Sequence, residues 1–209
     1  MLFKFNDVTI TRIQDYFDVD GTVKGVLKGQ RRRKKSSSDN LNPLHTVPTL
    51  VDGDNVIIDS NAINIYLVEK YDKNSTLYPS DPYQKALVNQ ILFFASGPLY
   101  STVSTALKPV MMQGARKILT NDIINVTNIY EDLEKLLEGK TWAAGSNLTL
   151  ADFALIPIIT TAELIVPIDE TKCPNLIGWI RRSKQLPYYH YDGKGLETFK
   201  TMLFNKLHS

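Results

Sequence analysis

Cysteine is almost absent from this sequence. Cys173 stands alone among 209 residues, which excludes a disulfide scaffold and any zinc site built from cysteines. The chain also lacks the glycine and proline excess of fibrous or disordered proteins, with 11 glycines, 10 prolines and 43% hydrophobic residues. Such a chain can bury a large core, as one domain or as two small ones. The lone cysteine fits a reducing compartment, so we expect a cytoplasmic protein.

Signals for secretion and for membranes are also missing. The N-terminal residues 1–7 contain no apolar stretch of signal-peptide length. A long apolar stretch at 148–168 contains Asp152, Glu163 and two prolines, and no aromatic belt flanks it. We therefore expect this stretch to form a buried core helix, and we expect no association with membranes.

Positive charge is concentrated in one part of the chain, although the net charge is only +2. Residues 1–40 contain nine basic and five acidic residues, whereas residues 41–209 contain fifteen and seventeen. Most of the excess is the run Arg31–Lys35, which leads into a serine-rich stretch. Five basic residues can contact nucleic-acid phosphates, but no aromatic interleaving or known motif accompanies them. We interpret the run as a solvated loop and expect no nucleic-acid binding.

A hairpin and a helix are the clearest features before residue 76. Two β-rich runs, Thr46–Val51 and Asn55–Ile58, flank the turn Asp52–Asp54, which predicts a hairpin. Asp59 or Ser60 then caps a helix that extends to about residue 71. In the first 40 residues the candidates for short strands are 8–10 and 23–27.

Only helical patterns remain after residue 80. They predict helices at 82–107 with an interruption at 96–98, and at 113–138, 149–163, 174–185 and 196–207. Thr149 and Asp152 form a capping arrangement in which each side chain can satisfy a free backbone N–H. The predicted architecture is a small α/β domain at 1–76, followed by an all-helical domain at 80–209.

Several separate motifs occur in order from residue 42 onward. They are Asn42–Leu50, Asp59–Ile63, Tyr66–Tyr71, Leu77–Pro79, Gly145–Asp152 and Leu186–Tyr189. Together they resemble the cytosolic glutathione S-transferases, the insect epsilon class most and the delta class next. The motifs cover about residues 41–209, and residues 1–40 do not match them. The resemblance implies a thioredoxin-like α/β domain that binds glutathione, a helical C-terminal domain, and a homodimer.

The resemblance also implies an activity. Members of the family conjugate the glutathione thiolate to small hydrophobic electrophiles in detoxification. Glutathione is then a co-substrate, and neither a separate cofactor nor a metal is expected. A member of the same fold that binds glutathione or hydrophobic ligands without turnover is the alternative.

One predicted glutathione-binding segment precedes the hairpin. The resemblance implies that Pro48 forms a cis peptide bond and that the backbone of Val47 pairs with the cysteinyl backbone of glutathione. His45 corresponds to a family residue that contacts the glycyl end. From the residues alone, Pro48 is a trans proline at a strand edge and His45 is a surface or packing residue.

The second predicted segment starts the helix after the hairpin. The resemblance implies that Ser60 and the helix N-terminus bind the γ-glutamyl carboxylate, and that Asp59 binds the γ-glutamyl ammonium. Asn61 stands where many relatives have histidine or arginine, so it can donate hydrogen bonds but provides no positive charge. From the residues alone, Asp59 or Ser60 is only an N-cap.

The electrophile pocket is predicted on the helix that follows Ser96. Tyr100, Val103, Ser104 and Leu107 have the i, i+3, i+4, i+7 spacing of one helical face. The same spacing fits a face packed into the core, and the resemblance favours the pocket.

No catalytic residue is identified. In the insect classes an N-terminal serine donates a hydrogen bond to the glutathione thiolate, which lowers the thiol pKa from about 8.5. No serine precedes Ser36, residues 36–38 lie too late in the chain, and nothing around Thr9 or Thr11 matches. Three explanations stay open: a segment of unrelated sequence replaces the family N-terminus, the protein binds without turnover, or an unrecognised hydroxyl acts.

Overall fold

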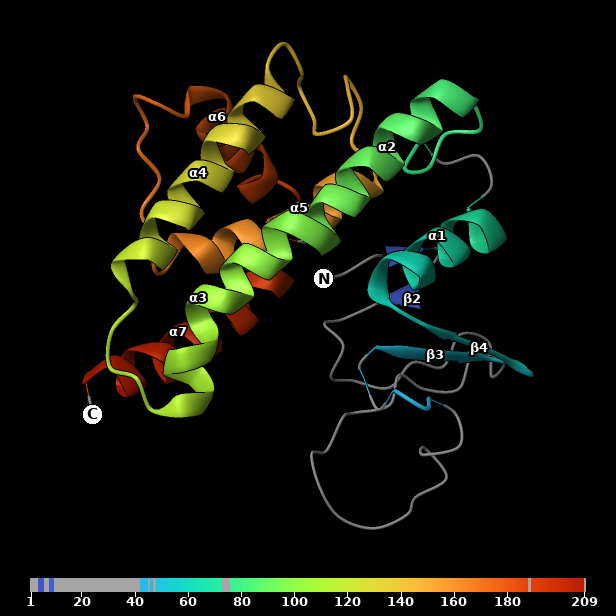
Figure 1. The fold of residues 1–209 in the computed structure, drawn as a ribbon. Coiled ribbons are helices and arrows are strands. Elements are labelled where there is room, and N and C mark those ends of the chain that lie inside the picture. The colour runs from blue at the N-terminus through green and yellow to red at the C-terminus, as the bar shows by residue number, and fades with distance from the viewer. Residues whose placement is uncertain are drawn as a thin grey trace. The chain divides into compact units, whose positions relative to one another are not determined.

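A computed structural model describes residues 4–5, 8–9, 42–44, 46, 48–72, 76–187 and 189–208. The chain divides into two compact units, residues 1–75 and 76–209. The first unit contains β1 (Lys4–Phe5), β2 (Val8–Thr9), β3 (Thr49–Asp52), β4 (Asn55–Ile58) and α1 (Ser60–Tyr71). The second contains α2 (Pro82–Phe94), η2 (Ala95–Leu99), α3 (Tyr100–Gln113), α4 (Thr120–Leu137), α5 (Leu150–Glu163), α6 (Pro174–Lys184) and α7 (Tyr189–His208) (Figure 1). The predicted order, an α/β part followed by an all-helical part, is confirmed.

β3 and β4 form the predicted antiparallel hairpin, with Gly53 and Asp54 as its loop. Gly53 has a φ of 61° and occupies the first central position, as in a type II′ turn. β3 begins at Thr49, later than predicted, because Pro48 has no N–H to donate to a strand ladder.

A second pair of short strands lies near the N-terminus. β1 and β2 are antiparallel to each other. The strand predicted at 8–10 is therefore confirmed for Val8 and Thr9. The strand predicted at 23–27 lies outside the described residues.

α1 packs against the hairpin through a small apolar core (Figure 1). Leu50 of β3 and Ile63 and Leu67 of α1 are its buried members. Three partly buried side chains surround them: Ile57, Tyr66 and Tyr71. Polar contacts between Asp52 and α1 also attach the helix to the hairpin.

The helix that starts at Pro82 continues where an interruption was predicted. α2 passes through the π-helical turn η2 into α3 without leaving the helical path. Pro98 lies inside η2, and the Ser96 hydroxyl donates to the carbonyl of Leu92 at 3.0 Å. A π turn replaces the i→i+4 pattern by i→i+5, which accommodates a proline that has no N–H to donate. The break predicted at 96–98 is therefore a change of helix type.

Two helix starts also differ from the predicted ones. Gly114, with a φ of 75°, ends α3, and α4 begins only at Thr120. α7 begins at Tyr189 and continues through Gly193 and Gly195. Glycine disfavours a helix by about 1 kcal/mol relative to alanine, which explains why the sequence pattern placed this start too late.

α5 is the central helix of the second unit (Figure 1). It contacts α2, η2, α3, α6 and α7, and ten of its 14 residues are buried. The apolar stretch at 148–168 is therefore a core helix, as predicted. In the described part of the chain, no helix combines the length and the apolar character needed to cross a membrane.

A buried carboxylate connects three parts of the helical unit. Oδ1 of Asp152 accepts hydrogen bonds from the backbone N–H of Ala143 at 2.7 Å and the indole N–H of Trp179 at 2.8 Å. Oδ2 accepts from the backbone N–H of Thr149 at 2.9 Å and from its hydroxyl at 3.3 Å. Burial raises the pKa of Asp152, and these donors limit the rise. The predicted capping arrangement is confirmed, and the carboxylate also attaches α6 through Trp179.

The N-terminus of α6 is capped by a side chain from α4. The Glu134 carboxylate accepts from the backbone N–H groups of Asn175 at 3.0 Å and Leu176 at 2.8 Å. It also accepts from the side-chain amide of Asn175 at 2.6 Å. The N-cap residue Cys173 makes no capping hydrogen bond with its own side chain. Glu134 thus provides the acceptor that the first N–H groups of a helix require.

Replacing Asp152 by alanine is expected to lower the free energy of unfolding by about 3 to 5 kcal/mol, because buried donors then have no acceptor. Urea unfolding followed by circular dichroism measures the change. The matched control is Glu170→Ala, since Glu170 forms an exposed ion pair with Arg181 at 2.9 Å, and its effect should stay within about 0.5 kcal/mol. Equal unfolding midpoints for both variants would contradict the role of Asp152.

Candidate functional site

The backbone is strained where β4 leads into α1. Asp59 has φ 78° and ψ 128°, and no other non-glycine residue in the described part of the chain has a positive φ. Such conformations cost about 1 to 3 kcal/mol and are concentrated at binding and catalytic sites. Oδ1 of Asp59 accepts from the backbone N–H groups of Asn61 at 2.9 Å and Ala62 at 3.1 Å. Asp59 is therefore the N-cap of α1.

The start of α1 combines a helix N-terminus with an exposed carboxylate. The helix dipole favours an anion, and the exposed carboxylate of Asp59 can attract a cation. Ser60 and Asn61 are half-buried beside it. Within the described ranges, the Ser60 hydroxyl makes no hydrogen bond to another residue. An α-amino acid group, which has a carboxylate and an ammonium on one carbon, is complementary to this arrangement.

A buried asparagine shapes the loop that precedes β3. The side-chain amide of Asn42 donates to the carbonyl of Thr46 at 2.7 Å and to its hydroxyl at 3.2 Å. It also donates to the hydroxyl of Thr49 at 2.9 Å, and its oxygen accepts from the N–H of Leu44 at 2.9 Å. These bonds connect both ends of the loop and hold the buried Pro48 directly before β3.

The structure brings the two predicted glutathione-binding segments to the same end of the hairpin. Thr49, which follows Pro48, pairs with Ile58, which precedes Asp59. Four of the predicted residues are described at this end: Pro48, Asp59, Ser60 and Asn61. His45 and Val47 lie outside the described residues, so their predicted contacts remain predictions.

The predicted pocket residues of α3 differ in exposure. Val103 is 4% exposed and Leu107 is 8% exposed, so both belong to the core of the helical unit. Tyr100 is 59% exposed and Ser104 is half-buried. The face defined by their spacing thus crosses the boundary between core and surface. Tyr100 and Ser104 are the two members that a ligand can reach.

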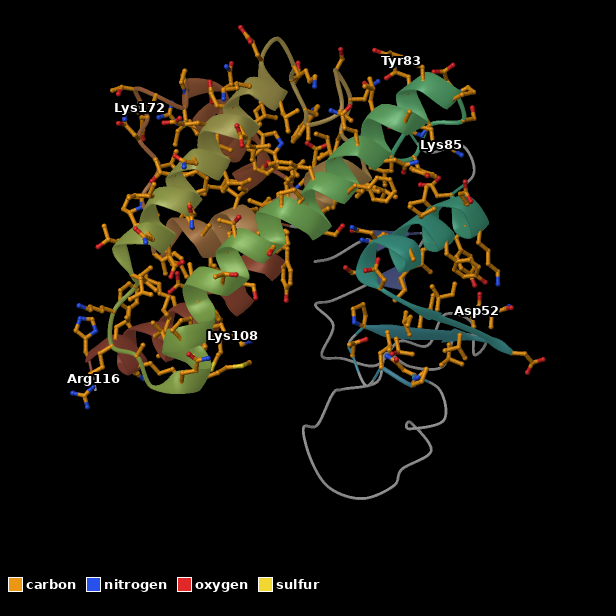
Figure 2. The ribbon with its side chains drawn as sticks, in the orientation of Figure 1. Asp52, Tyr83, Lys85, Lys108, Arg116 and Lys172 are labelled. Carbon is orange, nitrogen blue, oxygen red and sulfur yellow. The ribbon has the colours of Figure 1, made fainter. Side chains whose placement is uncertain are left out.

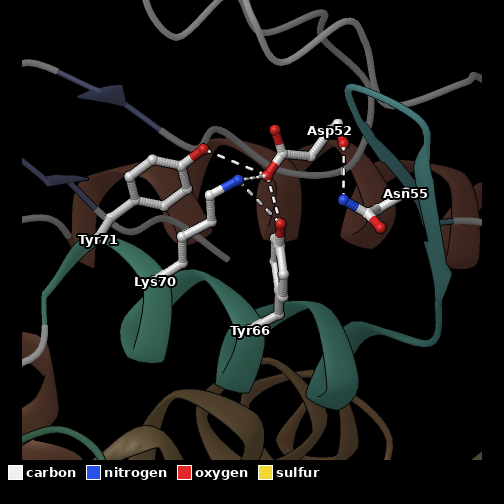
Figure 3. A network of polar contacts seen from close by, with 5 residues as sticks. All are labelled: Asp52, Asn55, Tyr66, Lys70 and Tyr71. Atoms are coloured by element: carbon white, nitrogen blue, oxygen red, sulfur yellow. Dashed lines mark hydrogen bonds and ion pairs between the residues drawn. The ribbon is translucent and has the colours of Figure 1, made fainter.

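A polar network at the tip of the hairpin was not anticipated from the sequence (Figure 3). Figure 2 marks the position of Asp52, its central residue. Asp52 ends β3, and its side chain is only 6% exposed. Its Oδ2 accepts hydrogen bonds from the hydroxyl of Tyr66 at 2.5 Å, from the ammonium of Lys70, and from the hydroxyl of Tyr71 at 3.3 Å. Lys70 also donates to the Tyr66 hydroxyl at 3.0 Å. The network joins the hairpin tip to the last two turns of α1.

This network holds Asp52 in its charged form. Burial by itself would raise the pKa of the Asp52 carboxyl, but the hydrogen bonds and the charge of Lys70 outweigh it, and the pKa is lowered. The hydrogen bond to Asp52 raises the pKa of Lys70 and that of Tyr66. The sequence signal for the network is the i, i+4 spacing of Tyr66 and Lys70, combined with an acidic residue at the end of a β-rich run.

A polar cleft of about 270 Å³ lies between α3 and α4. Hydroxyl groups of α3 line one side, and carboxylates and amides of α4 line most of the other. The lining residues are Ser101, Thr102, Thr105, Asp122, Asn125, Asn128, Ile129 and Asp132. Pockets for small hydrophobic ligands are lined mainly by apolar side chains, so this cleft is not suited to such a ligand.

Two family models match the chain. The model described as glutathione S-transferase, N-terminal domain, matches residues 15–75. The model described as glutathione S-transferase, C-terminal domain, matches residues 110–187. The N-terminal match extends back to residue 15, further than the short motifs from residue 42 onward reached. Residues 15–40 therefore lie inside the matched range, which corrects the boundary expected from the motifs.

Individual insect proteins are similar along most of the chain. Glutathione S-transferase 1 of Manduca sexta is 36% identical over 195 residues, which cover 92% of this chain and 86% of the relative. The structure of a glutathione transferase homologue from Drosophila mojavensis, with bound glutathione, is 38% identical with a TM-score of 0.78, and covers 82% of this chain and 79% of its own. An epsilon-class glutathione S-transferase from the housefly Musca domestica is 33% identical with a TM-score of 0.78, at coverages of 82% and 80%.

These similarities account for both units of the fold. The α/β unit is the thioredoxin-like N-terminal domain, and the helical unit is the C-terminal domain. The resemblance first indicated by the ordered motifs is confirmed by family models and by a relative that matches over most of its length. The chain belongs to the glutathione S-transferase family.

Proposed function

We propose that this protein is a glutathione transferase that joins the glutathione thiolate to small hydrophobic electrophiles. The observation that carries the proposal is the start of α1, where a helix N-terminus, the Ser60 hydroxyl and the Asp59 carboxylate lie together. This arrangement is complementary to the α-amino acid end of glutathione. The similar structure from Drosophila mojavensis holds glutathione, which supports the same ligand here.

Glutathione binding in this proposal uses both segments at the open end of the hairpin. Ser60 and the first turn of α1 take the γ-glutamyl carboxylate, with Asn61 next to them, while Asp59 takes the ammonium. The backbone of Val47, before Pro48, pairs with the cysteinyl residue as a short added strand. His45 contacts the glycyl end. The tripeptide is a co-substrate, and the reaction requires no other cofactor.

The chemistry is a nucleophilic attack by sulfur. A thiol with a pKa of about 8.5 is mostly protonated at neutral pH, so a donor that stabilises the thiolate increases the reactive fraction. With an aryl chloride, the thiolate forms the new carbon–sulfur bond and chloride leaves with the electron pair of the broken bond. Tyr100 and Ser104 face the electrophile, and Val103 and Leu107 support them from the core.

A binding protein without turnover is the second candidate function. It was suggested by the missing N-terminal serine motif, and no observation in the fold favours it. The relatives compared above are named transferases. We further propose a detoxifying homodimer in the cytoplasm, which agrees with a free and buried Cys173.

The protein is expected to form a thioether from glutathione and a chlorodinitrobenzene substrate faster than the uncatalysed reaction. Product absorbance measured over time, with enzyme-free and glutathione-free samples as controls, provides the rate. A folded protein that binds glutathione and gives no rate above background would contradict the transferase proposal and favour the binding protein.

The variant Ser60→Ala is expected to raise the KM for glutathione by about tenfold, because a hydrogen bond to a charged group is lost. The kcat at saturating glutathione should change little, since Ser60 contacts neither the sulfur nor the electrophile. Ser101→Ala, which removes an exposed serine hydroxyl from α3, is the matched control and should leave KM unaltered. An unchanged KM in Ser60→Ala would place the glutathione carboxylate elsewhere.

A further inference from the structure

The hairpin and α1 are attached to each other at two opposite ends. At one end the chain passes directly from β4 through the strained Asp59 into α1. At the other end Asp52, the last residue of β3, binds Tyr66, Lys70 and Tyr71 of α1 (Figure 3). The candidate glutathione site lies at the first end, and the network lies at the second. The two attachments together determine how α1 is oriented on the hairpin.

Within the described part of the chain, six apolar or aromatic side chains form the core between these ends. Among the described residues, Leu50, Ile63 and Leu67 are its buried members, with exposed fractions of 4%, 6% and 6%. Apolar contacts are also non-directional, so a few of them permit a helix to tilt or slide. Hydrogen bonds and an ion pair to one oxygen restrict both movements, because their geometry is directional.

Lys70 is the charged member of the network on α1. Its side chain is 42% exposed, whereas that of Asp52 is 6% exposed. The ammonium lies 5.4 Å from the ring centroid of Tyr66 and 5.3 Å from that of Tyr71, within range of cation–π attraction. Among the described donors, removing the ammonium would leave the Asp52 carboxylate with the two neutral phenols of Tyr66 and Tyr71. An anion that is buried without its counter-charge destabilises the arrangement that buries it.

We propose that Lys70 is a positioning residue for glutathione binding. By pairing with Asp52 it fixes the orientation of α1, and so places the first turn of that helix where the γ-glutamyl group of glutathione binds. The inference rests on the proposed function for the identity of the ligand. Lys70 itself touches neither glutathione nor the electrophile, since it lies at the opposite end of α1 from Ser60.

The test uses the full chain with Lys70→Met, which keeps the length of the stem and removes the charge. Isothermal titration with glutathione is expected to show a Kd raised by about tenfold, comparable to the loss of one charged hydrogen bond. The kcat at saturating glutathione should change little. Lys70→Arg restores the positive charge and should bring the Kd back to within about twofold of the original.

The matched control is Lys135→Met. Lys135 also pairs with an aspartate, Asp132, at 3.3 Å, but both side chains are exposed and lie in the helical unit. This control should leave glutathione affinity unchanged. Equal glutathione affinities for Lys70→Met and the unaltered protein would overturn the proposal, as would a Lys70→Arg variant as weak as Lys70→Met.

Amide hydrogen exchange gives a readout that does not depend on glutathione. In Lys70→Met the amides of Asn61 to Ile63, in the first turn of α1, should exchange faster than in the unaltered protein. The variant Tyr66→Phe, which removes one donor from Asp52 and keeps the ring, should show a smaller increase at the same amides. If the unaltered protein does not bind glutathione, the proposed function fails, and the exchange rates alone decide on positioning. Unchanged exchange of the first-turn amides in Lys70→Met would overturn the positioning role of Lys70.

Discussion

The candidate site depends on how α1 is held against the β3–β4 hairpin, and the buried carboxylate of Asp52 is one of the contacts that hold it. The helical unit uses the same device, because Asp152 joins a loop, the start of α5 and the side of α6. The two carboxyls have opposite pKa shifts for a physical reason. Asp52 is paired with the cation of Lys70, and its pKa is lowered, whereas Asp152 has only neutral donors in a buried position, and its pKa is raised.

The strain at Asp59 connects the fold to the proposed chemistry. A residue with this φ bends the chain so that the first turn of α1 lies beside the start of β3, where Pro48 stands. The carboxylate of Asp59 satisfies two helix N–H groups and still remains exposed. One residue thus caps the helix and provides a negative charge next to a helix end that favours an anion. An α-amino acid group, which has a carboxylate and an ammonium, is complementary to these two features.

Local patterns predicted much of the fold, and contacts between distant segments account for what they did not predict. The hairpin turn, a helix cap at Asp59 or Ser60 and the capping arrangement of Asp152 depend on neighbouring residues, and the sequence predicted each of them. The residues 96–98, which include Gly97 and Pro98, predicted a break in the helix, but the structure has a π turn there, with Ala95 and Leu99 buried. The Asp52–Lys70 network joins residues far apart in the chain, so periodicity alone could not reveal it. The same limit applies to the predicted pocket face, since spacing cannot separate core from surface.

Glutathione binding at the start of α1 can be measured by a titration followed by nuclear magnetic resonance. Isotope-labelled protein is titrated with glutathione, and the shift of each backbone amide is recorded. Among the described residues, we expect the largest backbone amide shifts at Ser60, Asn61 and Ala62. Largest shifts at the cleft between α3 and α4, or no shifts in α1 at saturation, would contradict it.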